Sequence, residues 1–324
     1  MQKILFTITF LLIISIHRSE QQGQNVIHTL FGDRDKTDVV YYGYVDLDKS
    51  EYTILNTLNT DDVGNPRQRK YQILPLTYDP TNDIAFMAAV NNQNRTILSV
   101  LNATTGALLR TFNSIPNGII SLQYDIFNKK LFAHTETNVD NVTHIVEIDT
   151  NAGSFKQILG EISGAKPTDI CSYCPICRKY FFVMIENDHF TYLAVNTTDG
   201  GGISWRVPIN FAPLNIRFTY KTFIMYAAFV NQTDRITSQI GILDRTTGSI
   251  SKVVGTISSR ENLLATRFSA FDIATSTYYI SDVMRIPFSR GISSLNVNTS
   301  ETKRVTLPEN NYNFYAWFIK QFVQ

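Results

Sequence analysis

The sequence predicts an all-β protein built from six repeats of about fifty residues, each folded as four antiparallel strands. Three observations predict it: one turn phrase recurs six times, a second turn phrase recurs in step with it, and each end of the chain supplies part of one repeat. The chain has 324 residues, of which 44% are hydrophobic and 18% are charged. This composition is that of a folded globular protein and excludes collagen-like, coiled-coil and disordered chains.

The first recurring phrase consists of an Asp or Asn followed by Thr or Ser and, in most copies, by Gly. It is centred on Asp48, Asn102, Asp149, Asn196, Asp244 and Asn298, at intervals of 54, 47, 47, 48 and 54 residues. An Asp or Asn side chain can accept backbone N–H groups two residues further on, and Gly supplies a positive φ. Each copy is therefore expected to be a tight turn between two strands.

The second phrase begins with an aromatic residue, and the next position is usually Asp. Two further residues follow, then usually Asn or Thr, and then an apolar strand. Its copies begin at Tyr78, Tyr124, Tyr173, Phe218 and Phe271. Two turns in each repeat imply four strands. In the second repeat we expect these strands over residues 73–78, 84–90, 96–101 and 107–112.

Four-stranded antiparallel units repeated around an axis form a β-propeller, so we predict a six-bladed β-propeller. The blades are expected at roughly 26–60 together with 310–321, 70–113, 117–160, 166–209, 213–257 and 262–307. The first of these has three strands near the start of the chain and one near the end, so pairing of the N- and C-terminal strands would complete it and remove two exposed sheet edges. Two β-sandwich domains are the alternative, which the sixfold repeat disfavours.

The phrase from Tyr78 to Phe86, followed by a strand and the Asn102-Ala-Thr-Thr-Gly106 turn, resembles the NHL and YVTN-type repeats of the β-propeller superfamily. The resemblance extends over about residues 26–321. Its motifs are short and structural, so it implies an architecture and does not imply a reaction.

The first 19 residues are expected to form a signal peptide, leaving 20–324 as the propeller. Lys3 precedes an apolar run over residues 4–16, which is too short to span a bilayer. The segment before Glu20 lacks a small-x-small cleavage pattern, so an uncleaved anchor is the alternative. We expect a secreted protein without stable membrane insertion. Because 29 Lys and Arg nearly balance 28 Asp and Glu, we expect no nucleic-acid partner.

Six Asn-x-Ser/Thr sequons fall in segments expected to be turns, where glycosylation acceptors belong. They are Asn94, Asn102, Asn141, Asn196, Asn231 and Asn298. Asn and Thr are also common turn residues, which explains part of this pattern. We expect several of the six to carry glycans.

All three cysteines lie close together, at Cys171, Cys174 and Cys177. Cys174 and Cys177 occupy the Asp and Asn positions of the second phrase, so a disulfide between them could close that turn. Pairing of Cys171 with Cys177 is the alternative, and either choice leaves one thiol over. No fourth ligand lies nearby, so we assign no metal site to them.

No contiguous motif of a hydrolase, zinc peptidase or phosphate-binding loop occurs, so we assign no catalytic residue and expect no cofactor. The leading interpretation is an extracellular binding module for a protein or a glycan. The alternative is a calcium-dependent hydrolase, since resemblance to lactonase propellers would imply a calcium ion on the axis. The polar residues on the expected inner strands are Gln123, Asp169 and Arg267.

Overall fold

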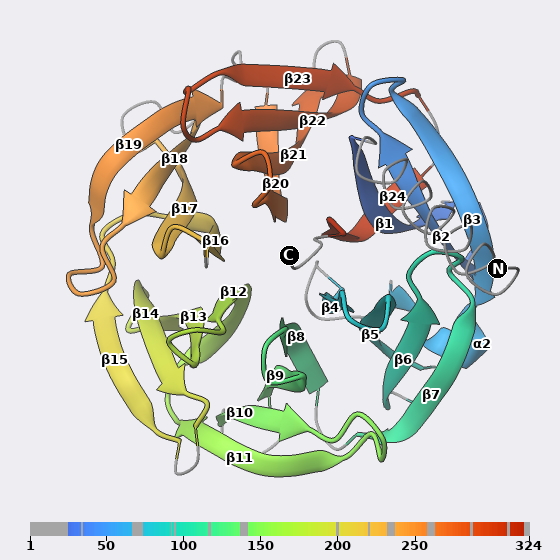
Figure 1. The fold of residues 1–324 in the computed structure, drawn as a ribbon, viewed down its shortest axis with the longest axis horizontal. Helices are drawn as coiled ribbons and strands as arrows, with labels where there is room; N and C mark the ends of the chain where they lie inside the picture. The colour runs from blue at the N-terminus through green and yellow to red at the C-terminus, as the bar shows by residue number, and fades with distance from the viewer. Residues whose placement is uncertain are drawn as a thin grey trace, which may run out of the picture.

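The computed structural model describes residues 25–320, apart from 34, 67–73, 92, 94, 116–117, 137–141, 199–200, 220, 232–236, 258–262, 286–287 and 310–311. In this part of the chain the strands form six four-stranded antiparallel sheets around a central axis (Figure 1). The predicted six-bladed β-propeller is thus confirmed, and the alternative of two β-sandwiches is wrong. The expected signal peptide, residues 1–19, lies outside the described residues.

We number the blades in chain order and give the strands of each from the axis outward (Figure 1). Blade 1 contains β24 (Tyr312–Phe318), β1 (Val26–Asp33), β2 (Val39–Asp46) and β3 (Glu51–Asn59). Blade 2 contains β4 (Leu76–Asp79), β5 (Ile84–Val90), β6 (Thr96–Asn102) and β7 (Leu108–Ile115). Blade 3 contains β8 (Gly118–Asp125), β9 (Lys130–Glu136), β10 (Thr143–Ile148) and β11 (Phe155–Ile162).

Blade 4 contains β12 (Lys166–Cys174), β13 (Lys179–Glu186), β14 (His189–Asn196) and β15 (Ile203–Pro208). Blade 5 contains β16 (Pro213–Thr219), β17 (Ile224–Val230), β18 (Ser238–Leu243) and β19 (Ile250–Ile257). Blade 6 contains β20 (Leu263–Asp272), β21 (Thr277–Arg285), β22 (Phe288–Asn296) and β23 (Thr302–Thr306). One short helix, α2 (Thr60–Val63), follows β3. Among the described residues, no helix has both the length and the apolar character needed to cross a membrane.

The ring is closed by antiparallel pairing of β24 with β1, as the sequence predicts (Figure 1). Trp317 lies opposite Thr29, and Ala316 lies opposite Leu30. The Thr29 hydroxyl donates a further hydrogen bond to the Ala316 carbonyl at 3.0 Å. The C-terminal strand therefore becomes the inner strand of blade 1, which places Trp317 beside the axis.

In the part of the chain that the structure describes, the hydrophobic core forms six clusters, one between each pair of neighbouring blades. Between blades 2 and 3, for example, the rings of Phe86 and Tyr124 stack 5.9 Å apart. The cluster that closes the ring packs Ile27 and Trp317 of blade 1 against Ile292 of blade 6. Each large side chain buried in this way contributes about 1.5–3 kcal/mol, so the blades are held together mainly by apolar burial.

Both recurring phrases form turns at the same end of the blades, because antiparallel strands alternate in direction. We call the turn between the first and second strands of a blade its inner turn and that between the third and fourth its outer turn. In an inner turn, Asp125 Oδ1 accepts the backbone N–H groups of Phe127 and Asn128. In an outer turn, Asn102 Oδ1 accepts those of Thr104 and Thr105, and Gly106 takes a φ of 72°. We call the side that bears these turns the bottom face and the other side the top face.

Candidate functional site

A cavity of about 200 Å³ lies on the axis at the bottom face. Inner-turn residues, among them Pro80, Ile126 and Pro175, line its mouth. All six inner strands contribute one aromatic residue to its wall: Tyr78, Tyr124, Tyr173, Phe218, Phe271 and Phe318. Five of these six are the aromatic residues that begin the second phrase. That phrase therefore supplies both the inner turns and an aromatic collar around the axis.

A smaller cavity of about 60 Å³ continues along the axis toward the top face. Five residues line both cavities and so form the layer between them: Leu76, Gln123, Arg217, Ser269 and Trp317. Asp169, Cys171 and Asn215 line the smaller cavity only. The axial polar groups thus lie at different depths. The buried carboxylate of Asp169 lines the smaller cavity, whereas the six aromatic residues line the larger one.

Two of the three polar residues expected on the axis are found there. Gln123 lines both cavities and donates from Nε2 to Cys171 Sγ at 3.3 Å. Asp169 is buried beside the smaller cavity, and the side chain of Arg267 lies outside the described part of the structure. Sequence reasoning missed Asn215 and Arg217. They stand two positions apart on β16, and alternate residues of a strand lie on the same face. This spacing is a signal in the sequence that could have identified them as a pair.

Of the described residues that line the larger cavity, Arg217 alone carries a charged side chain. Its Nη2 donates to the Ser269 carbonyl oxygen at 2.7 Å, which ties the guanidinium of β16 to β20. Within the described residues Arg217 makes no ion pair with a carboxylate. A partly buried cation is therefore held at the base of an aromatic-walled cavity.

Around the mouth, the inner turns of blades 3, 4 and 5 each expose one apolar side chain. The exposed fractions are 49% for Phe127, 46% for Ile176 and 51% for Phe223. Each of these residues stands two positions from an exposed cation, namely Lys129, Arg178 and Lys221 respectively. Three consecutive blades thus repeat the same pair of one apolar and one positive group.

The backbone of these turns is bent into the left-handed region at a fixed position. Lys129, Arg178 and Phe223 occupy it with φ values of 54°, 48° and 58°. Residues other than Gly and Asn take this conformation at a cost of about 1–2 kcal/mol. Asp83 and Ser276 take the same conformation at the matching positions of blades 2 and 6, so this bend is a general feature of the inner turns.

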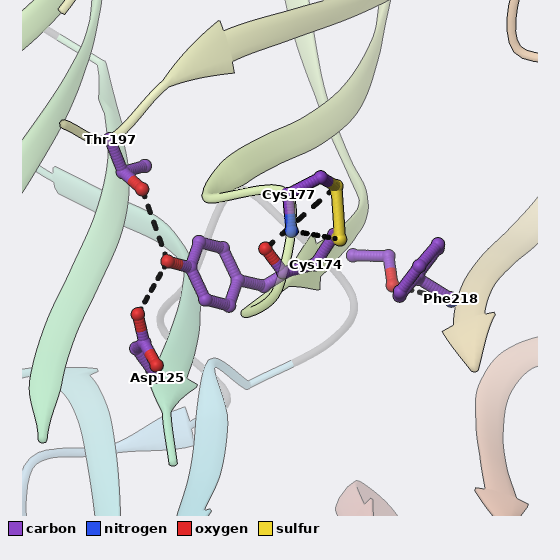
Figure 2. Close-up of a disulfide and its surroundings, with 7 residues drawn as sticks. Asp125, Cys174, Cys177, Thr197 and Phe218 are labelled. Carbon is purple, nitrogen blue, oxygen red and sulfur yellow. Dashed lines mark hydrogen bonds between the residues drawn. A yellow bond between two sulfur atoms is a disulfide. The ribbon is translucent and has the colours of Figure 1, made fainter. Parts of the chain in front are cut away.

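The inner turn of blade 4 is closed by a disulfide between Cys174 and Cys177, the first of the two pairings expected from the sequence (Figure 2). The Cα atoms are 5.5 Å apart, and the backbone N–H of Cys177 also points to Cys174 Sγ at 2.9 Å. Cys171 is the thiol left over; it is 4% exposed, and burial raises its pKa. The disulfide therefore restrains the turn that displays Ile176.

The described sequons divide between the two faces. Asn102, Asn196 and Asn298 lie in or beside outer turns, at the periphery of the bottom face, whereas Asn231 follows β17 at the top face. Asn94 and Asn141 lie outside the described residues. Glycans at the three peripheral positions would leave the centre of the bottom face accessible. Their occupancy stays a prediction.

The axial residues are poorly matched to a cation. Among the described residues, no group of three or more His, Cys, Asp or Glu side chains is arranged to hold a metal ion. Asp169, Asn215 and Gln123 offer oxygen atoms around the smaller cavity, but Arg217 lines the same cavity. Its positive charge opposes a bound cation there.

No family model and no curated protein sequence matches this chain. By contrast, 1040 chains of known structure match it, so the fold is a common one. A nidogen/laminin complex gives a TM-score of 0.61 at 11% identity, covering 91% of this chain and 99% of the matched chain. TolB from Acinetobacter baumannii gives 0.60 at 11% identity, covering 90% of this chain and 66% of TolB.

A candidate 6-phosphogluconolactonase from Bacteroides uniformis gives a TM-score of 0.55 at 14% identity, covering 88% of this chain and 84% of that one. At such low identities these likenesses establish the β-propeller fold and nothing more specific.

Proposed function

We propose that this chain is an extracellular binding module whose bottom face binds a protein with an acidic, partly apolar surface. The observation that carries the proposal is the repeated pair of exposed groups on the inner turns of blades 3, 4 and 5. Exposed apolar groups gathered on one face are typical of interaction sites. The three cations beside them favour a partner of opposite charge.

The rigidity of these turns supports the proposal, since a preformed surface loses little conformational entropy on binding. Backbone hydrogen bonds to Asp125 hold the turn that displays Phe127, and the Cys174–Cys177 disulfide holds the turn that displays Ile176. The similar structures include a protein complex, that of nidogen with laminin, so this fold occurs within a protein assembly.

The proposal includes export through the secretory pathway, with removal of residues 1–19 and glycans on the periphery. The turn phrases also support an NHL or YVTN type of repeat. Both statements rest on the sequence.

The test compares a bottom-face variant with a variant changed equally elsewhere. Phe127→Ser, Ile176→Ser and Phe223→Ser are combined in one protein. The matched control combines Leu109→Ser, Ile158→Ser and Val253→Ser, three residues that are also exposed but lie on the outermost strands. Immobilised protein is exposed to extracellular protein from its own source, and captured proteins are quantified by mass spectrometry.

The wild type and the control should capture the same protein, and the bottom-face variant should lose it by about tenfold or more. Raising the salt concentration should weaken capture, because the cations are exposed. Equal capture by the bottom-face variant, or no specific capture by the wild type, would contradict the proposal. Capture that disappears after enzymatic removal of glycans from the sample would identify a glycan partner instead.

A calcium-dependent hydrolase is the second candidate function: Gln123, Asp169 and Asn215 line one small axial cavity, although Arg217 in the same lining opposes a bound cation. Calcium takes oxygen ligands of these kinds. A rise of Tm with added calcium that Asp169→Asn abolishes, together with lactone hydrolysis, would favour this function over the binding module.

A further inference from the structure

We propose that the larger axial cavity binds a small monocarboxylate that carries an apolar, preferably aromatic, body. This goes beyond the partner-binding role of the bottom face. The small ligand would occupy the axis, whereas the protein partner would contact the turns around it. The two proposals can therefore fail separately.

The walls of the cavity favour an apolar body. Six aromatic rings, one from each inner strand, surround it, and Trp317 adds a seventh. Ile126, Ile273 and Ile319 line it near the mouth. Ligand sites typically combine such apolar walls with a few polar groups that fix the orientation of the ligand.

The base of the cavity favours a negative charge. A guanidinium has five N–H donors in a planar fork that matches a carboxylate, and Arg217 uses Nη2 on the Ser269 carbonyl. That bond fixes the guanidinium while leaving further donors for a ligand. No carboxylate is among the described residues that line this cavity, so none of them neutralises the cation.

A second donor lies at the same depth. Trp317 lines both cavities, and its buried indole Nε1 has no hydrogen-bond acceptor among the described residues. An indole N–H can only donate a hydrogen bond, so a ligand oxygen that accepts from Arg217 or beside it would also suit the Trp317 N–H.

The charge balance selects a monocarboxylate rather than a phosphate. One guanidinium compensates one negative charge, whereas a phosphate dianion in a partly buried site would need more cations. Asp169 lines only the smaller cavity, and its carboxylate would repel an anion placed deeper than Arg217. The geometry points to a carboxylate beside Arg217 and an apolar body directed toward the mouth.

The chain contains two tryptophans, Trp205 and Trp317, so Trp205→Phe leaves the cavity residue as the only indole. In this background, 3-phenylpropionate is titrated against the fluorescence of Trp317, with neutral 3-phenylpropionamide as the matched probe. Calorimetry on the wild type checks that the background change is harmless. The acid should bind saturably, and the amide should bind about tenfold more weakly or worse because it lacks the charge.

Arg217→Gln should weaken binding of the acid by about tenfold or more and leave binding of the amide unchanged. Arg217→Lys keeps the charge without the fork and should give an intermediate affinity. Arg110→Gln is the matched control, because Arg110 is exposed on β7, the outermost strand of blade 2, and lies outside the cavity lining.

Three results would each overturn the proposal: no saturable binding of the acid to the wild type, equal affinity for acid and amide, or an equal loss in the Arg110→Gln control. The comparison of acid with amide needs no Arg217 variant, so it holds even if such a variant fails to fold. Protein capture should survive Arg217→Gln, which separates this test from that of the proposed function.

Discussion

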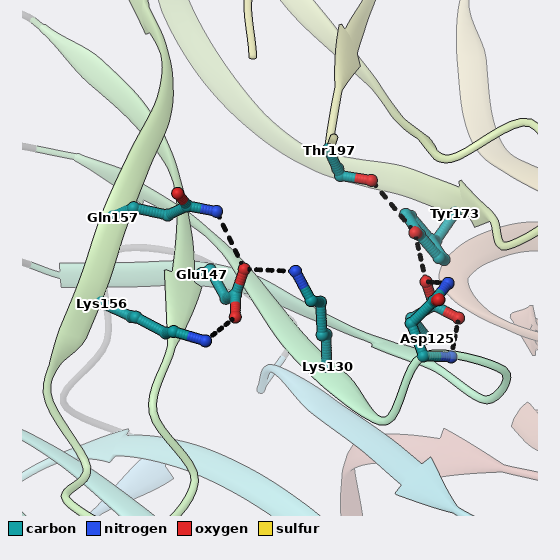
Figure 3. Close-up of polar contacts among 8 residues, drawn as sticks. Asp125, Lys130, Glu147, Lys156, Gln157, Tyr173 and Thr197 are labelled. Carbon is teal, nitrogen blue, oxygen red and sulfur yellow. Dashed lines mark hydrogen bonds and ion pairs between the residues drawn. The ribbon is translucent and has the colours of Figure 1, made fainter. Parts of the chain in front are cut away.

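Tyr173 in blade 4 donates its hydroxyl to Asp125 Oδ2 in the inner turn of blade 3, with the two oxygens 2.6 Å apart (Figure 3). The bond crosses a blade boundary. One blade earlier, burial and a hydrogen bond with Asp79 both raise the pKa of Tyr124. The Tyr of one copy of the second phrase is therefore paired with the Asp of the preceding copy.

At two of the other blade boundaries, both the Asp and the Tyr of this pair are replaced. Cys174 replaces Asp where the next blade has Phe218, and Thr219 replaces Asp where the next blade has Phe271. A lost acceptor is thus matched by a lost hydroxyl. At the closing boundary Asp272 faces a blade with Phe in place of Tyr, and its carboxylate bonds within its own turn.

Tyr173→Phe should lower the free energy of unfolding by about 1.5–3 kcal/mol, because it removes a buried hydrogen bond to a carboxylate. Urea denaturation measures the change. Phe218→Tyr is the matched control: its added hydroxyl would meet no carboxylate in the turn of blade 4, so it should not stabilise the protein. An unchanged midpoint for Tyr173→Phe would contradict this interblade role.

The sequence was sufficient for the architecture because the turn signals are local and repeat in register. Asp125 forms its turn with residues two and three positions further on, so spacing alone reveals it. Its bond to Tyr173 joins residues 48 positions apart and follows only once neighbouring blades are placed side by side.

The candidate site was less accessible to sequence reasoning. Arg217 looks like any charged residue beside an aromatic until β16 is known to be an inner strand. The exposed residues Phe127 and Phe223 stand at different positions of their turns, so no shared motif marks them. Their gathering on one face depends on closure of the ring.

The cysteine assignment predicts a stepwise pattern of alkylation. Native protein should not react with iodoacetamide, since Cys171 is buried. Unfolded but unreduced protein should gain one adduct, on Cys171, and unfolded, reduced protein should gain three. Mass spectrometry counts the adducts. Three adducts on the unreduced chain, or an adduct on Cys174 in it, would contradict the Cys174–Cys177 bond.

Glu147 predicts a specific pH dependence. Burial alone would raise its pKa, but hydrogen bonds from Lys156 and Lys130 outweigh burial, so the pKa is lowered from 4.5 (Figure 3). A lowered folded pKa gives stability that is present above the unfolded pKa and is lost as pH falls through the folded value. Glu147→Gln should therefore cost about 1–2 kcal/mol at about pH 7 and much less at about pH 3.

Urea midpoints of both proteins at the two pH values measure this difference. Lys130→Gln serves as a companion variant and should show the same trend with a smaller amplitude, because Lys156 still bonds Glu147. A loss that does not change with pH would contradict the ion-pair account.

Secretory expression in a eukaryotic host should release a glycoprotein whose sequence begins near residue 20. Peptide mapping after enzymatic deglycosylation identifies the occupied sequons. Asn102→Gln should also destabilise the fold by about 1 kcal/mol, because Asn102 Oδ1 accepts two backbone N–H groups. Asn298→Gln should remove only a glycan, since Asn298 is exposed. Retention of the protein in the cell, or release with an intact leader, would contradict the proposed export.

The cavity and the bottom face both depend on β24, which closes the ring and brings Trp317 to the axis. Hydrogen–deuterium exchange of the intact protein, followed by mass spectrometry, tests this closure directly. Backbone amides of Tyr312–Phe318 should exchange as slowly as those of Gly118–Asp125, the inner strand of blade 3, because both strands are hydrogen-bonded within a blade. Exchange of Tyr312–Phe318 within seconds, while Gly118–Asp125 stays protected, would contradict the closed ring and the axial site built on it.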